Sequence, residues 1–91
     1  MDEFQVNIFK ALAHPVRLKI AKRLSEGEMC VCEMNEDIEF SQANLSQHLK
    51  ILKDAKVVNA KKCGMFMYYS IKSGKIKELI RLTEELYYEK E

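Results

Sequence analysis

The sequence has few of the residues that interrupt helices and strands. Its 91 residues include three glycines, one proline and no tryptophan. So few breaks leave no candidate linker, and this length suits one domain rather than two. We therefore expect residues 1–91 to form a single domain. A domain of this size buries only about 60–65% of its unfolded surface, which favours association with a second copy.

Membrane and export signals are also missing. No run approaches the roughly 18 apolar residues that a membrane span needs. Asp2 and Glu3 stand where a signal peptide would carry basic residues. The three cysteines are an odd number, which argues against a disulfide scaffold and favours reduced thiols. We expect a cytoplasmic protein that has no membrane partner.

The patterns of common enzymes are absent from the sequence. There is no glycine-rich phosphate loop, no nucleophile–base pair and no complete catalytic metal site. A thiol oxidoreductase would favour a C-x-x-C pair, whereas Cys30 and Cys32 form a C-x-C pair. We expect no enzymatic activity and no obligatory cofactor.

Charge is distributed unevenly, although the net charge is only +1. Between Ser41 and Lys77 there are eight lysines and one acid, Asp54, and acidic segments flank this block on both sides. No acid lies between Ser41 and Lys53. Such a lysine excess suits the phosphates of nucleic acid. The simpler alternative is a lysine-rich, solvated surface.

Apolar residues at helical spacing predict four helices, over residues 3–13, 15–27, 30–37 and 41–54. Pro15 suits a first helical turn, with His14 at the capping position before it. Ser41 offers an N-cap hydroxyl to the fourth helix. That helix has an apolar stripe of leucines at positions 45, 49 and 52, and His48 beside it is expected to support packing or contact a phosphate.

The period then changes to that of strands. Residues 57–62 and 66–71 are rich in valine, tyrosine, phenylalanine and isoleucine, and Gly64 between them suits a hairpin tip. A last helix is expected from about Gly74. The order ααααββα predicts a mostly α protein with a β-hairpin wing, which is a winged helix-turn-helix.

Four segments carry a family resemblance, namely residues 11–20, 28–34, 40–52 and 62–71. In this order they resemble the opening, the metal-box helix, the recognition helix and the wing of the ArsR/SmtB family of metal-responsive repressors. The resemblance implies a homodimeric repressor that leaves its operator when an inducer binds. His14 and Val16 replace the aspartate and threonine that are usual in the opening segment.

Candidate DNA-reading residues lie on the fourth helix and the hairpin. Glutamine and asparagine can bond adenine bidentately in the major groove, and serine can bond several bases. Lysines suit phosphates, which position the protein without specifying sequence. The candidates are Ser41, Gln42, Asn44, Ser46 and Gln47 for bases and Lys50, Lys53, Lys61 and Lys62 for phosphates.

Thiols are the candidate inducer site. Cys30 and Cys32 are soft ligands suited to As(III), Sb(III) or a soft divalent metal ion. In a regular helix they would point about 200° apart, so that binding one ion should deform the short helix. Cys63, at the hairpin tip, is a candidate third ligand that could reach the pair only across the subunit or from a dimer partner. The C-terminal helix contains no histidine, so the zinc site of related sensors is not expected there.

Two alternatives for the thiols stay open. Oxidation or persulfidation of the same cysteines could replace ion binding, or the cysteines could simply pack as small apolar residues. A winged helix that serves only as a protein-interaction module is a further alternative to DNA binding.

The terminal helices carry more apolar residues than a small core needs. Pairing them across a two-fold axis would bury both helices in a homodimer. For such a homodimer we expect a palindromic operator with half-sites ~10 bp apart. The expected interface residues are Phe4, Ile8, Leu12, Ile76, Leu79, Ile80 and Leu86.

Overall fold

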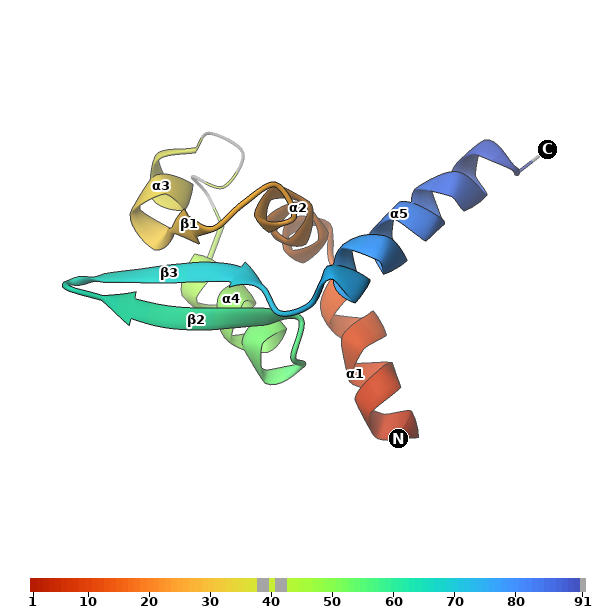
Figure 1. Ribbon diagram of the computed structural model, residues 1–91, viewed down its shortest axis with the longest axis horizontal. Helices are drawn as coiled ribbons and strands as arrows, with labels where there is room; N and C mark the ends of the chain where they lie inside the picture. Colours follow the sequence, from red (N-terminus) through yellow and green to blue (C-terminus); the bar gives the residue numbers. More distant parts are fainter. Residues whose placement is uncertain (38–39, 41–42, 91) are drawn as a thin grey trace.

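The computed structural model describes residues 1–37, 40 and 43–90 (Figure 1). Its elements in chain order are α1 (Asp2–Leu12), α2 (Pro15–Leu24), β1 (Met29–Cys30), α3 (Val31–Glu36), α4 (Leu45–Asp54), β2 (Val58–Cys63), β3 (Phe66–Ile71) and α5 (Gly74–Tyr88). The predicted mostly helical chain with a hairpin is confirmed. No helix in these described parts is long and apolar enough to cross a membrane.

The three strands form one antiparallel sheet in the order β1-β3-β2. The β2–β3 hairpin, called the wing below, turns at Gly64, whose φ of +64° is the left-handed conformation that glycine tolerates. The short strand β1 was not predicted. It pairs Met29 with Tyr69 and Cys30 with Tyr68, so the segment before α3 belongs to the wing sheet.

Helix starts follow local signals in α2 but not in α4. The His14 ring accepts a hydrogen bond from the Val16 backbone N–H at 3.1 Å, and Pro15 occupies the first turn, as predicted. Helix α4 begins at Leu45 with Asn44 at the N-cap, so the predicted start at Ser41 is wrong. Phe40, which precedes α4 in the chain, is buried in the core.

The core lies where α2, α4 and the base of α5 meet the sheet. Leu45, Leu49 and Leu52 are buried on α4, as their spacing predicts. Val57 and Val58, at the start of the wing, are also buried in this core. Burying this single face fixes which side of α4 remains in solvent, and that side carries the polar residues.

Some apolar residues of the terminal helices that we expected in a dimer interface lie instead in the core of the protomer. Ile76 and Ile80 are buried in the core of their own protomer, because the first turns of α5 pack against that core. They therefore present almost no surface to a partner, and their assignment to a dimer interface is corrected. Leu86 is 64% exposed and Leu82, which the prediction omitted, is 45% exposed.

On α1, Phe4 is exposed, whereas Ile8 and Leu12 are half-buried against the core. Phe9, also missing from the expected interface, is exposed. Figure 1 shows α1 and α5 extending away from the rest of the molecule, with the two chain ends at their tips. The outer turns of both helices thus expose apolar side chains that their own protomer does not cover.

Candidate nucleic-acid interface

The exposed face of α4 carries the candidate base-reading residues. Ser46 and Gln47 are exposed in its first turn, and the Asn44 side chain donates to the Gln47 side-chain oxygen at 3.0 Å. This hydrogen bond holds two amide groups together at the helix start. Ser41 and Gln42 lie outside the described residues, so their position relative to this face is not described.

Lysines continue the same face toward the C-terminus of α4. Lys50 donates to the Asp54 carboxylate at 2.8 Å, one helical turn away. This hydrogen bond raises the pKa of Lys50 and lowers the pKa of Asp54. Asp54 is the one acid of the lysine block. Because its exposed ammonium group has three N–H donors, Lys50 can keep this bond and still contact a phosphate.

The wing contributes a second group of cations. Lys61 and Lys62 are exposed on β2, opposite Tyr68 and Met67 of β3. Strand β2 contacts α4, with Lys53 exposed on the helix. Figure 1 shows the wing extending well beyond α4. One molecule therefore offers a polar helix face and a projecting cationic hairpin.

His48 seats α4 against α2 rather than pointing to solvent. Its ring centroid lies 4.6 Å from that of His14, and its Nδ1 lies 3.3 Å from an Arg17 guanidinium nitrogen. Arg17 also donates from Nε to the Ala11 carbonyl at 2.8 Å, which ties in the end of α1. Partial burial, then the neighbouring His14 and Arg17, lower the pKa of His48. Of the two roles expected for His48, packing and phosphate contact, these contacts support packing.

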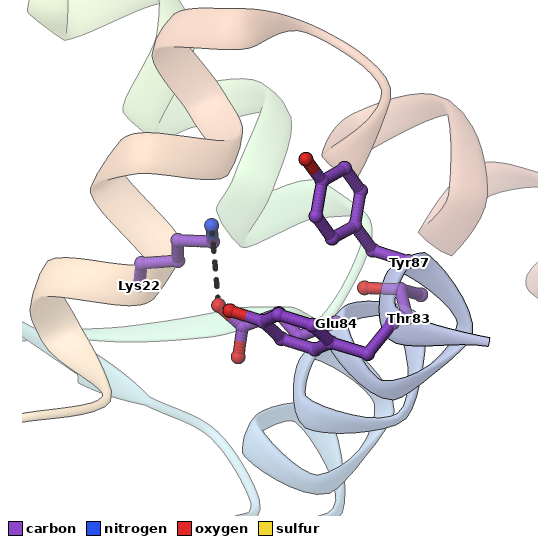
Figure 2. Close-up of a pocket in the computed structure, with 5 residues that line it drawn as sticks. Lys22, Thr83, Glu84 and Tyr87 are labelled. Carbon is purple, nitrogen blue, oxygen red and sulfur yellow. Dashed lines mark ion pairs between the residues drawn. The ribbon is translucent and has the colours of Figure 1, made fainter. Parts of the chain in front are cut away.

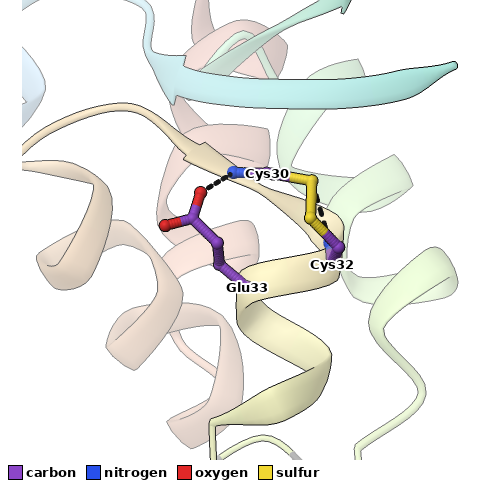
Figure 3. The surroundings of a disulfide bond; sticks show 3 residues. All are labelled: Cys30, Cys32 and Glu33. Atoms are coloured by element: carbon purple, nitrogen blue, oxygen red, sulfur yellow. Dashed lines mark hydrogen bonds between the residues drawn. A yellow bond between two sulfur atoms is a disulfide. The ribbon is translucent and has the colours of Figure 1, made fainter.

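The two cysteines of the C-x-C pair lie together at the start of α3 (Figure 3). A disulfide joins Cys30 and Cys32, whose Cα atoms are 5.2 Å apart. Cys30 Sγ accepts a hydrogen bond from the Cys32 backbone N–H at 3.1 Å, and the Glu33 carboxylate accepts one from the Cys30 N–H at 2.9 Å. Cys30 and Glu33 thus form a capping box at the start of α3.

This geometry corrects the expectation that the two thiols diverge. Cys30 is not in the helix; it is the N-cap residue, with extended φ and ψ of −80° and 146°. Its sulfur can therefore meet that of Cys32 while α3 keeps its hydrogen bonds. Cys30 is only 2% exposed, whereas Cys32 is exposed. A reagent would thus reach Cys32 first.

Cys63 does not join this pair within one protomer. It is exposed and lies opposite Phe66, whereas Cys30 lies opposite Tyr68 on the other side of β3. Two strand spacings and two residues along a strand place their backbones about 12 Å apart. One ion would hold two sulfurs within about 5 Å of each other. Among the described residues, no group of three or more histidine, cysteine or acidic side chains could hold a metal ion.

A hollow between α2 and the outer turns of α5 is a weaker candidate (Figure 2). Lys22, Glu84, Tyr87 and Tyr88 line it, with 3.4 Å between the Lys22 Nζ and a Glu84 carboxylate oxygen. Both partners are about half exposed, and ion pairs of this kind contribute at most about 1 kcal/mol. Its lining includes no thiol and no imidazole. The sequence had not pointed to it.

Comparisons with known proteins agree with this arrangement. Residues 14–60 match the family described as "Bacterial regulatory protein, arsR family". An uncharacterised helix-turn-helix transcriptional regulator of Methanocaldococcus jannaschii is 44% identical over 89 residues, covering 94% of this chain and 100% of that protein. The arsenical resistance operon repressor of Bacillus subtilis is 42% identical over 79 residues, covering 86% and 73%.

Solved structures share the fold over nearly the whole chain. HlyU from Vibrio cholerae superposes with a TM-score of 0.80 and 35% identity, covering 94% of each chain. A homodimeric winged helix-turn-helix DNA-binding domain from Mycobacterium bovis superposes with a TM-score of 0.81 and 29% identity, covering 96% of this chain and 81% of that one. The predicted winged helix-turn-helix is thereby confirmed.

The environment of His48 leads to a prediction about pH. Because its pKa in the folded protein lies below the ordinary 6.5, the unfolded chain binds a proton more tightly. The contribution of neutral His48 to the free energy of unfolding is therefore present above pH 6.5 and is lost as the pH falls through the lowered pKa. His48→Gln should flatten the fall in the free energy of unfolding between about pH 7 and pH 5, measured by urea titration. An unchanged pH dependence would show that His48 does not titrate in this way.

Proposed function

Since the chain belongs to the arsR family of bacterial regulatory proteins, we propose that it represses transcription as a homodimer whose DNA binding is controlled by Cys30 and Cys32. Members of this family are DNA-binding transcriptional regulators rather than enzymes. One observation carries the proposal for control. Cys30, Tyr68 and Lys61 form a single row across the wing sheet, and the same Cys30 caps α3.

DNA is read by α4 and positioned by lysines. The start of α4 enters the major groove, where Asn44, Ser46 and Gln47 meet base edges. Ser41 and Gln42 precede this helix in sequence and remain candidates for the same groove. Phosphate contacts come from Lys50, Lys53, Lys61 and Lys62. Because the partner is double-stranded DNA, we place the protein in the cytoplasm.

Two copies associate through the outer turns of α1 and α5. Leu82 and Leu86 expose an apolar stripe on α5, and Phe4 and Phe9 extend α1 beyond the core. Covering them removes apolar surface from water, and a two-fold axis pairs each helix with its own copy. The comparison with a homodimeric domain from Mycobacterium bovis supports this arrangement. The operator is then palindromic, with half-sites ~10 bp apart.

The thiols of Cys30 and Cys32 can react in two ways. In the first, the two thiols lose two electrons and two protons to a peroxide or a disulfide, and an S–S bond forms between them. In the second, the two thiols replace two hydroxyl groups of arsenous acid and an external thiol replaces the third, and each hydroxyl group leaves as water with the proton of the thiol that replaces it. The pairing of Cys30 with Cys32 supports the first reaction, and similarity to an arsenical resistance repressor supports the second.

Either reaction takes place at the residue that both caps α3 and pairs at the edge of the wing sheet. Helix α3 is the element that precedes α4 in the chain, while the Cys30 backbone pairs with β3. A coupling free energy of about 1–3 kcal/mol would lower operator affinity by about 5–150-fold. No cofactor is needed in the DNA-bound state under this proposal.

Base reading and phosphate binding should separate in two variants. Ser46→Ala should lose about 1–3 kcal/mol of discrimination between a duplex selected by the wild-type protein and a random duplex. Lys62→Ala should weaken both duplexes alike and reduce the salt slope by about one unit. Fluorescence anisotropy at several salt concentrations measures both quantities. Equal losses on the two duplexes for Ser46→Ala would remove Ser46 from base reading.

Two substitutions on α5, one at Leu82 and one at Ile80, test the dimer interface. Leu82→Glu should yield folded monomers in sedimentation velocity, because Leu82 is exposed in the protomer. Ile80→Ala should instead lower the free energy of unfolding by about 2–5 kcal/mol, because Ile80 is buried in its own core. A Leu82→Glu protein that remains dimeric would place the interface elsewhere.

The thiol role is tested by serine substitutions. Cys30→Ser keeps an oxygen at the N-cap, and Cys32→Ser changes an exposed side chain, so both proteins should bind the selected duplex normally. Neither should release it on adding diamide or sodium arsenite, whereas Cys63→Ser, the matched control, should respond like the wild type. Release by only one reagent identifies the chemistry.

Release of the duplex by the double Cys30/Cys32→Ser protein would show that the pair is not the sensor. If the wild-type protein enriches no duplex from a random library, the interaction-module alternative replaces the DNA-binding proposal altogether.

A further inference from the structure

The tip of the wing exposes an apolar side chain that the fold does not need. Met65 is 92% exposed and Phe66 beside it is 52% exposed. Gly64 and Met65 form the two-residue turn between Cys63 and Phe66, a place where small or polar residues are usual. Packing within the protomer therefore gives no reason for methionine at this position.

The surroundings of the tip are cationic. Lys61 and Lys62 precede it on β2, and the sequence contains no acid between Asp54 and Glu78. An apolar tip on an arm that carries only positive charge is complementary to a polyanion with an apolar interior. Stacked base pairs between phosphate strands are such a partner.

The length of the wing matches the spacing of DNA grooves. Each strand has six residues, so the hairpin extends about 20 Å from its base, where β2 contacts α4. Half of a DNA helical turn, which separates the major groove from the next minor groove, is about 17 Å. With α4 in the major groove, the tip reaches the neighbouring minor groove.

Resting on the proposed function, we infer that Met65 enters the minor groove beside each half-site and wedges between two base pairs. The groove is about 6 Å wide, which admits one side chain at the turn but not the whole ribbon. Methionine is unbranched and flexible, so it fills an irregular gap between bases. The preferred site is a TA or CA/TG step, which unstacks most easily, and the duplex bends there.

The test uses duplexes selected from a random library by the wild-type protein, with a fluorophore at each end. Wild-type protein should shorten the end-to-end distance and prefer a TA step in the flank over a GC step. Met65→Ala and Met65→Gln should abolish the bend and the flank preference and should bind at least about fivefold more weakly. Their salt slope should stay that of the wild type, because no charge changes.

Lys62→Ala is the matched control on the same hairpin. It should lower the salt slope while the bend and the flank preference persist. Circular dichroism of the Met65 variants checks that the fold is unchanged, as expected for a side chain so exposed.

Met65 variants that still bend the selected duplex and still prefer the TA flank would overturn the wedge and leave the proposed function intact. Failure of the wild-type protein to enrich any duplex would overturn the proposed function and this inference together.

Discussion

The pairing of β1 with β3 is the constraint on which the rest of the arrangement depends. Its two residues, Met29 and Cys30, attach the segment before α3 to the wing. Because the pairing ends at Cys30, that residue keeps an extended backbone and its sulfur lies at the N-cap of α3, within bonding distance of Cys32. The same two residues therefore position the thiol pair, begin the helix before α4 and support the middle strand of the wing.

A second set of contacts holds the helix that we propose reads DNA. Arg17 donates a hydrogen bond to the end of α1 and approaches His48 of α4, and the His14 ring lies tilted against the His48 ring. These groups lie on the side of α4 away from Ser46 and Gln47, which leaves the polar face exposed. Partial burial, then His14 and Arg17, lower the pKa of His48, which favours the neutral ring beside the Arg17 guanidinium. Rigid support of this kind suits a helix that must present side chains to base edges in a fixed register.

Prediction from sequence succeeded mainly where the signals are local, although the local N-cap signal at Ser41 did not mark the start of α4. The leucine spacing of α4, the His14–Pro15 start of α2 and Gly64 in the wing turn all depend on neighbours in the chain. Prediction failed where the partner is distant. Strand β1 is too short to show a period, and its pairing is decided by Tyr68 and Tyr69 far along the sequence. The prediction that the Cys30 and Cys32 side chains diverge was wrong for the same reason, since pairing in β1, not the helix, sets the backbone conformation of Cys30.

The terminal helices show the same division. Sequence by itself determined that α1 and α5 are amphipathic, and that lysines crowd one block, because periodicity and composition are properties of the chain alone. Only the tertiary structure decided that Ile80 faces the core of its own protomer while Leu82 faces solvent. Both are apolar residues on one helix, and which of them is covered depends on the angle at which α5 docks on the core. Docking angles arise from packing between distant side chains, and no local pattern encodes them.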